Sequence, residues 1–92
     1  MLTEPEEHWL ESTLAQNPAA GNVVSGTGGV RKLRVALRGR GKSGGARVIY
    51  YFRGARQRVY LILAYRKNTK LNLTGAERRV MRTLVAKLES EP

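Results

Sequence analysis

Apolar and polar side chains alternate along the middle of the chain, a pattern that is typical of strands with one buried face. In residues 30–37, Lys32 and Arg34 alternate with apolar side chains, which predicts a half-buried strand with a basic outer face. Residues 46–53 and 58–66 are rich in Val, Ile, Leu and Tyr, and a short turn joins them. These two segments predict an antiparallel hairpin.

Helices are predicted on both sides of these strands. Thr3 and Glu6 have the spacing of a capping box, in which each side chain bonds the backbone N–H of the other residue, and they open a helix over residues 3–16. Thr74 and Glu77 repeat this spacing and open a second helix. Its apolar side chains form one stripe, made of Val80, Met81, Leu84, Val85 and Leu88.

The connector over residues 19–29 is rich in small residues, with Val23-Val24 as a short strand and a tight turn at residues 26–29. The order of elements predicts an α+β fold with a small antiparallel sheet of three to four strands, packed with an N-terminal and a C-terminal helix. Ninety-two residues are enough for a single domain, residues 1–92. No apolar run approaches the ~20 residues of a membrane span, and the acidic N-terminus is unlike a signal peptide. We therefore expect no membrane association and a cytoplasmic location.

The charge of the chain is concentrated in one part of the sequence. The formal net charge is +10, yet the first thirty residues hold four Glu and no Arg or Lys. Between Arg31 and Lys67 there are twelve Arg and Lys residues and no acidic side chain. This stretch contains a Gly-rich run, residues 38–47, in which Arg38, Arg40 and Lys42 alternate with glycine. Because glycine lets backbone N–H groups approach phosphate and cations release its counterions, the segment predicts binding of RNA or DNA.

The residue types that are missing restrict the chemistry. The chain has no Cys and no Asp, and its one His is His8, so a thiolate zinc site and a carboxylate magnesium site in the basic segment are both excluded. We expect no cofactor. The Gly41-Lys42-Ser43 sequence resembles part of a nucleotide-binding P-loop, but a strand follows it where a P-loop opens a helix. Any reaction on a nucleic acid is therefore predicted to be metal-free.

Metal-free RNA cleavage requires a base for the 2′-OH, stabilisation of the phosphorane and a proton for the leaving 5′-oxygen. Lys42 and Lys67 are candidates for proton transfer, because neighbouring cations lower the pKa of a lysine. Arg47 is the candidate for holding the phosphate oxygens, and Tyr65 for stacking on a splayed base. For each of these residues a simple contact with the phosphate backbone is an equally good interpretation.

Three sequence blocks resemble one family. They are Gly26-Thr27-Gly28-Gly29-Val30-Arg31-Lys32-Leu33-Arg34, Gly41-Lys42-Ser43-Gly44-Gly45-Ala46-Arg47-Val48-Ile49-Tyr50-Tyr51 and Leu63-Ala64-Tyr65-Arg66-Lys67-Asn68 followed by Leu73-Thr74. In order and spacing they are similar to the HigB branch of the RelE/ParE superfamily of bacterial toxins. The resemblance implies the toxin of a type II toxin–antitoxin system, an endoribonuclease that cleaves mRNA on the ribosome and is silenced by an antitoxin, often of the helix-turn-helix type.

By the same resemblance, the cations of the active surface fall on Lys32, Arg34, Lys42, Arg47 and Lys67, and we add Arg38 and Arg40 as RNA-binding residues. Two alternatives stay open: a non-catalytic module that binds nucleic acid or an antitoxin, and a gyrase inhibitor of the ParE kind. Members of this branch usually begin with a further strand and helix, so the sequence also predicts an N-terminally shortened fold. An unpaired sheet edge would then favour self-association or dependence on the antitoxin.

Overall fold

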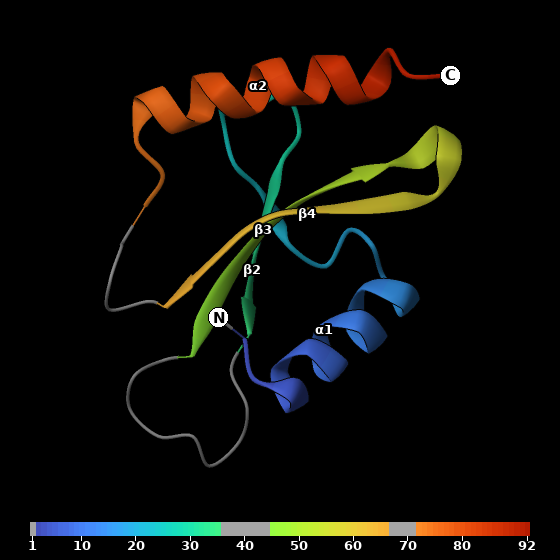
Figure 1. Ribbon diagram of the computed structural model, residues 1–92, viewed down its shortest axis with the longest axis vertical. Coiled ribbons are helices and arrows are strands. Elements are labelled where there is room, and N and C mark those ends of the chain that lie inside the picture. Colours follow the sequence, from blue (N-terminus) through green and yellow to red (C-terminus); the bar gives the residue numbers. More distant parts are fainter. Residues whose placement is uncertain (1, 36–44, 67–71) are drawn as a thin grey trace.

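The computed structural model describes residues 2–35, 45–66 and 72–92. A four-stranded antiparallel sheet lies between two helices, α1 (Glu4–Gln16) and α2 (Gly75–Glu89) (Figure 1). The strands follow one another in the sheet in chain order, β1 (Asn22–Val23), β2 (Arg31–Val35), β3 (Ala46–Arg53) and β4 (Arg58–Arg66). The predicted α+β fold class is confirmed.

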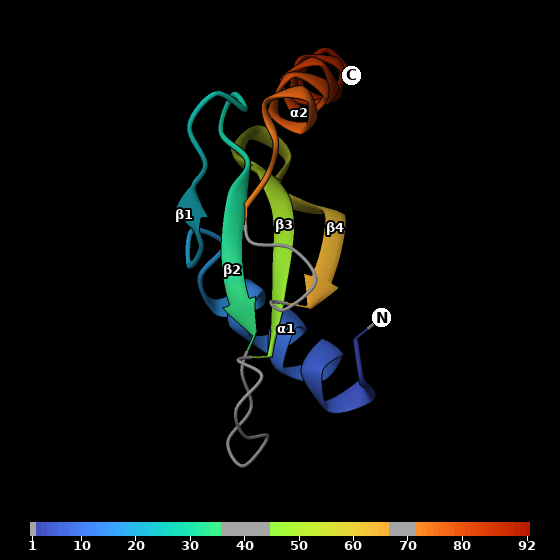
Figure 2. The same cartoon turned by 90° about the vertical axis from the view of Figure 1, so that its left-hand side faces the viewer.

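The two helices cover opposite faces of the sheet, as the view from the side shows (Figure 2). Successive residues of a strand point to opposite faces, and β3 divides accordingly. Val48 and Tyr50 belong to the apolar cluster that includes Leu10 and Leu14 of α1, whereas Ile49 belongs to the cluster of α2. The small core is therefore split into two layers by the sheet.

Helix α1 begins with the predicted capping box. The Thr3 side chain accepts from the Glu6 backbone N–H, and the Glu6 carboxylate accepts from the Thr3 backbone N–H at 2.8 Å. Pro5 occupies the first turn, where the missing N–H costs nothing. Leu10 and Leu14, four residues apart, are buried against the sheet.

The connector after α1 is held down by Tyr50. The fully buried Tyr50 hydroxyl accepts from the Gly21 backbone N–H at 2.9 Å and donates to the Pro18 carbonyl at 2.6 Å. A Cβ on Gly21 would lie 2.8 Å from the Lys32 carbonyl oxygen, so this close approach of two backbones requires glycine. The connector then supplies the short strand β1, whose bounds are one residue earlier than the predicted Val23-Val24.

The β3–β4 hairpin has the predicted bounds and is the longest element of the sheet. A 3-10 turn (Gly54–Arg56) and the left-handed residue Gln57, with φ of 49°, connect its strands. The register shifts between Ile49 and Tyr50. Strand β2 is described as far as Val35, so the predicted end of this strand at residues 36–37 lies outside the described residues.

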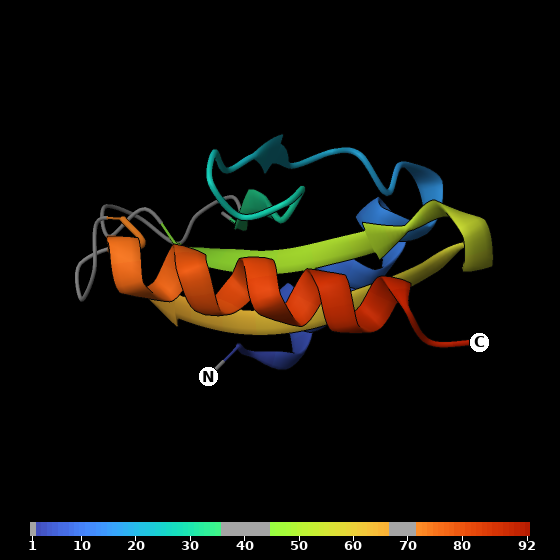
Figure 3. The same ribbon diagram turned by 90° about the horizontal axis from the view of Figure 1, so that it is seen from above.

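Helix α2 crosses the other face of the sheet, seen from above in Figure 3. Its capping box between Thr74 and Glu77 is present as predicted. Met81 and Val85 are buried, but Val80, which belongs to the predicted apolar stripe, is 68% exposed. Val80 lines a groove at the outer side of β4, where no described strand continues the sheet beneath it.

Candidate functional site

Two arginines lie directly opposite each other on adjacent strands. In the register of β2 and β3, Arg34 pairs with Arg47, and directly opposite residues of an antiparallel pair project from the same face. Arg34 is exposed and Arg47 is half-buried. We call these two residues the arginine row. It lies next to the end of the sheet where β2 ends and β3 begins.

Like charges directly opposite each other destabilise a sheet. Such an arrangement is stabilised when an anion lies between the cations, since a guanidinium can bind two oxygens of one phosphate. Lys32 lies two residues before Arg34 and therefore on the same face, and its Nζ is 3.4 Å from the Asn72 side-chain oxygen. Three of the predicted cations are thus brought together on one face of the sheet.

The other predicted cations, Lys42, Lys67, Arg38 and Arg40, lie outside the described residues. By chain connectivity, residues 36–44 join the end of β2 to the start of β3, and residues 67–71 follow the end of β4. Both segments therefore attach to the same end of the sheet as the arginine row. Their placement at the site stays a prediction.

Two arginines of the basic segment, Arg31 and Arg53, have structural roles that the sequence analysis did not anticipate. Arg31 donates to the Gly21 carbonyl at 2.7 Å and supports the connector. Arg53 is buried and donates to the carbonyl of Glu91 at 2.7 Å, and its Nε lies 3.7 Å from the Glu89 carboxylate. It therefore anchors the end of α2 to the sheet.

Tyr51 takes part in the same anchor, because its hydroxyl donates to the Glu89 carboxylate. Burial and, second, this hydrogen bond raise the pKa of Tyr51 to about 12. The phenol therefore stays neutral at physiological pH and is no candidate for a base in catalysis.

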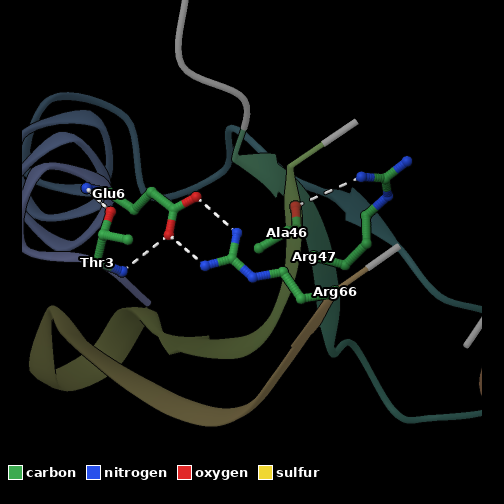
Figure 4. A network of polar contacts seen from close by, with 5 residues as sticks. All are labelled: Thr3, Glu6, Ala46, Arg47 and Arg66. Atoms are coloured by element: carbon green, nitrogen blue, oxygen red, sulfur yellow. Dashed lines mark hydrogen bonds and ion pairs between the residues drawn. The ribbon is translucent and has the colours of Figure 1, made fainter. Parts of the chain in front are cut away.

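Arg66, the last residue of β4, forms a bidentate pair with Glu6 of α1 (Figure 4). Its two terminal nitrogens donate to the carboxylate at 2.8 and 3.0 Å. Glu6 is only 3% exposed. The hydrogen bond from Arg66, opposed in part by burial, lowers the Glu6 pKa to about 2, and the pKa of Arg66 is raised in turn. The pair is therefore ionised at any physiological pH.

One family model matches residues 14–91 of the chain, and its description is "RelE toxin of RelE / RelB toxin-antitoxin system". The match includes all four strands and α2. The chain belongs to the RelE toxin family. It is therefore the toxin of a toxin–antitoxin system, and an antitoxin is its partner. The α+β fold, with two helices and a four-stranded antiparallel sheet, is consistent with RelE-like toxins.

One predicted site residue of this RelE toxin has a different position. Tyr65 lies in register with Arg47, yet its side chain is buried with Ile49 and Met81 in the cluster beneath α2. Only 9% of the residue is exposed. The prediction that Tyr65 stacks on an RNA base was therefore wrong. Tyr65 projects from the same face as the arginine row, but on β4 this face is filled by the apolar cluster beneath α2.

No helix in the described part of the RelE toxin is both long and apolar enough to cross a membrane. Within residues 2–35, 45–66 and 72–92, no three His, Cys, Asp or Glu side chains gather as metal ligands would.

The outer edge of β4 is a second surface of interest in this RelE toxin. No described strand pairs with this edge, and two apolar side chains of β4, Leu61 and Leu63, are 60% and 36% exposed. A groove of about 500 Å³ lies on the α1 side of Leu61, and another of about 330 Å³ lies between Leu63 and Val80 of α2. An unpaired apolar edge of this kind is a surface on which an added strand can bind.

Proposed function

We propose that this RelE toxin is a metal-independent endoribonuclease that cleaves mRNA on the ribosome. RelE-type toxins are generally ribonucleases. The observation that carries the proposal is the arginine row, in which Arg34 and Arg47 project from one face of the sheet within a segment that has no acidic residue. Two opposed cations at a strand end provide a site for the phosphate of a polyanion.

The proposed reaction is an attack of the ribose 2′-oxygen on the adjacent phosphorus. The bond from phosphorus to the 5′-oxygen breaks, leaving a 2′,3′-cyclic phosphate and a 5′-hydroxyl. One lysine in its neutral form takes the proton of the 2′-OH, and a second, protonated lysine gives a proton to the 5′-oxygen. We assign these transfers to Lys42 and Lys67, because His8, the one histidine of the chain, is on α1.

Arg47 is assigned to the phosphorane, where negative charge develops in the transition state. Arg47 projects from β3, whose backbone is held by β2 on one side and by β4 on the other. Arg34 and Lys32, together with Arg38 and Arg40, are assigned to the RNA backbone on either side of the scissile phosphate.

Induced expression with mapping of mRNA 5′ ends tests the proposal. We expect new 5′ ends within translated regions for the wild-type toxin. Arg47→Ala should lower the cleavage rate by ~10²-fold, as for the loss of one oxyanion donor, and RNA affinity by much less. Arg56→Ala, which removes an exposed cation from the hairpin turn, is the matched control. Equal losses of rate and affinity in Arg47→Ala would assign Arg47 to binding alone.

For the antitoxin, we propose a helix-turn-helix protein whose acidic and apolar segment covers the open edge of β4. Support comes from the exposed Leu61 and Leu63 and from the grooves on both sides of this edge. A shared alternative is a second copy of the chain on the same edge. Sedimentation of the wild type and of Leu61→Lys, each with and without the antitoxin, distinguishes the two occupants. A lysine at this edge opposes the binding of either one. Association that is seen without the antitoxin is self-association.

A further inference from the structure

The Glu6–Arg66 pair connects α1 to the row of residues that ends the sheet. Val35, Ala46 and Arg66 face one another across β2, β3 and β4. Val35 and Ala46 are fully buried in the α1 cluster, so this row projects toward α1. Arg66 completes the row and reaches the Glu6 carboxylate, which is 60 residues away in the sequence (Figure 4).

The arginine row is the next row of the sheet and projects from the opposite face. Ala46 directly precedes Arg47, and the Ala46 carbonyl accepts from a terminal nitrogen of the Arg47 guanidinium at 3.4 Å. The end row therefore supports the backbone that carries Arg47. Because β4 has no described strand on its outer side, its last residue is held by β3 on one side and by the Glu6 carboxylate from α1.

We propose that Glu6, acting through Arg66, is a positioning residue for the arginine row. A strand end at a sheet edge opens easily when its contacts are few. The bidentate pair fixes Arg66 on the α1 side, and this fixes the spacing of β3 and β4 beneath Arg47. Glu6 itself touches no RNA. The proposal rests on the proposed function, in which the arginine row holds the scissile phosphate.

Nothing in the family match assigns this role. The match begins at Leu14, so Thr3 and Glu6 lie before it, whereas Arg66 lies within it. Glu6 also closes the capping box of α1. Its substitution therefore has two effects, one on the stability of α1 and one on the position of the sheet end, and an experiment has to separate them.

The test variant is Glu6→Gln, which keeps the size of the side chain and an oxygen for the Thr3 N–H but removes the charge that binds Arg66. Two control variants are compared with it. Leu14→Ala loosens α1 by removing buried apolar contacts and leaves the Glu6–Arg66 pair in place. Glu89→Gln removes the carboxylate that pairs with Arg53, an arginine at the opposite end of β3.

Single-turnover cleavage of ribosome-bound mRNA is measured for the four proteins at a temperature where all are folded, with backbone amide exchange of β3 and β4. We expect Glu6→Gln to lower the maximal rate by ~10- to 100-fold, as a misplacement of about 1 Å does, and to speed exchange at Arg47 and Tyr65. Leu14→Ala and Glu89→Gln should change the rate by less than about threefold, because neither substitution moves the strand ends that carry the arginine row.

The double variant Glu6→Gln with Arg66→Gln removes both charges of the pair and leaves no guanidinium without its carboxylate at the end of β4. It should recover part of the rate lost in Glu6→Gln, because the residues act as a unit. Equal rate losses in Glu6→Gln and Leu14→Ala, or unchanged exchange at Arg47 in Glu6→Gln, would overturn the proposal. A wild-type toxin that cleaves no RNA would refute the proposed function, and amide exchange would still decide whether Glu6 positions the sheet end.

Discussion

Tyr50 and Tyr65 are both buried in the sheet, but their hydroxyl groups have opposite surroundings. The Tyr50 hydroxyl bonds the Gly21 N–H and the Pro18 carbonyl. The Tyr65 hydroxyl is buried and has no hydrogen-bond partner among the described residues. Buried tyrosine hydroxyl groups usually find a partner, and one that does not lowers stability by its lost hydration. Removing the oxygen by substitution with Phe should therefore have opposite effects at the two positions.

The magnitudes follow from the groups that each substitution leaves behind. Tyr50→Phe leaves a buried N–H and a carbonyl without their partner, so the free energy of unfolding should fall by ~1–3 kcal/mol. Tyr65→Phe leaves no group unpaired and removes a desolvated hydroxyl, so the free energy of unfolding should rise by ~1 kcal/mol. Tyr65→Ala, which empties the space of the ring, should lower it by ~3–5 kcal/mol.

Urea unfolding of the three variants measures these changes, provided that the slope with urea stays constant. A loss of more than about 1 kcal/mol in Tyr65→Phe, the value of one hydrogen bond, would refute the reasoning, since it would show that the hydroxyl has a partner in the native state. The same variant tests the site. Because the ring is in the core, Tyr65→Phe should cleave mRNA at the wild-type rate, and a large loss of rate with unchanged stability would show that the hydroxyl contacts RNA.

Three further predictions concern charge and the open edge. Because the Glu6 pKa is lowered from 4.5 to about 2, the contribution of its ionised form to stability is present above about pH 4.5 and is lost as the pH falls through 2. Between these pH values, the urea midpoint should therefore fall less steeply with decreasing pH in Glu6→Gln than in the wild type. RNA affinity should fall with salt, and Arg34→Ala should reduce the slope of log affinity against log salt by ~0.7, the value of one phosphate contact on a single strand, while Arg56→Ala leaves it unchanged. Without antitoxin, the wild-type chain should self-associate in sedimentation experiments and Leu61→Lys should be less associated, because a lysine on a sheet edge opposes pairing; a monodisperse wild-type monomer would contradict this.

Local signals in the sequence were sufficient for the secondary structure. The capping boxes at Thr3 and Thr74 and the bounds of the β3–β4 hairpin depend on residues close together in the chain, and all are present in the structure. The exposure of Val80 could not be predicted in this way. It depends on whether a strand lies beyond β4, which is a property of the sheet and not of the helix stripe.

The candidate site was predictable only in part, for a similar reason. The alternation of residues 30–37 placed Lys32 and Arg34 on the outer face of their strand, but the pairing of Arg34 with Arg47 depends on the register of β2 and β3. Tyr65 was assigned to RNA from its neighbours in the sequence. Whether a residue of β4 faces solvent or the core depends on where α2 lies over the sheet, and the sequence of β4 alone does not specify it.

The distribution of the acidic residues explains which cations remain for a polyanion. Between described residues, ion pairs join Glu89 of α2 to Arg53 and Glu6 of α1 to Arg66. Both carboxylates belong to helices outside the basic segment, and each binds an arginine at one end of a hairpin strand, where helix and sheet meet. The arginine row lies on the face opposite Glu6 and at the other end of β3 from Arg53, the partner of Glu89. A count of cations in the sequence therefore overstates the charge that a polyanion can bind, because two of the arginines, Arg53 and Arg66, hold the two helices against the sheet.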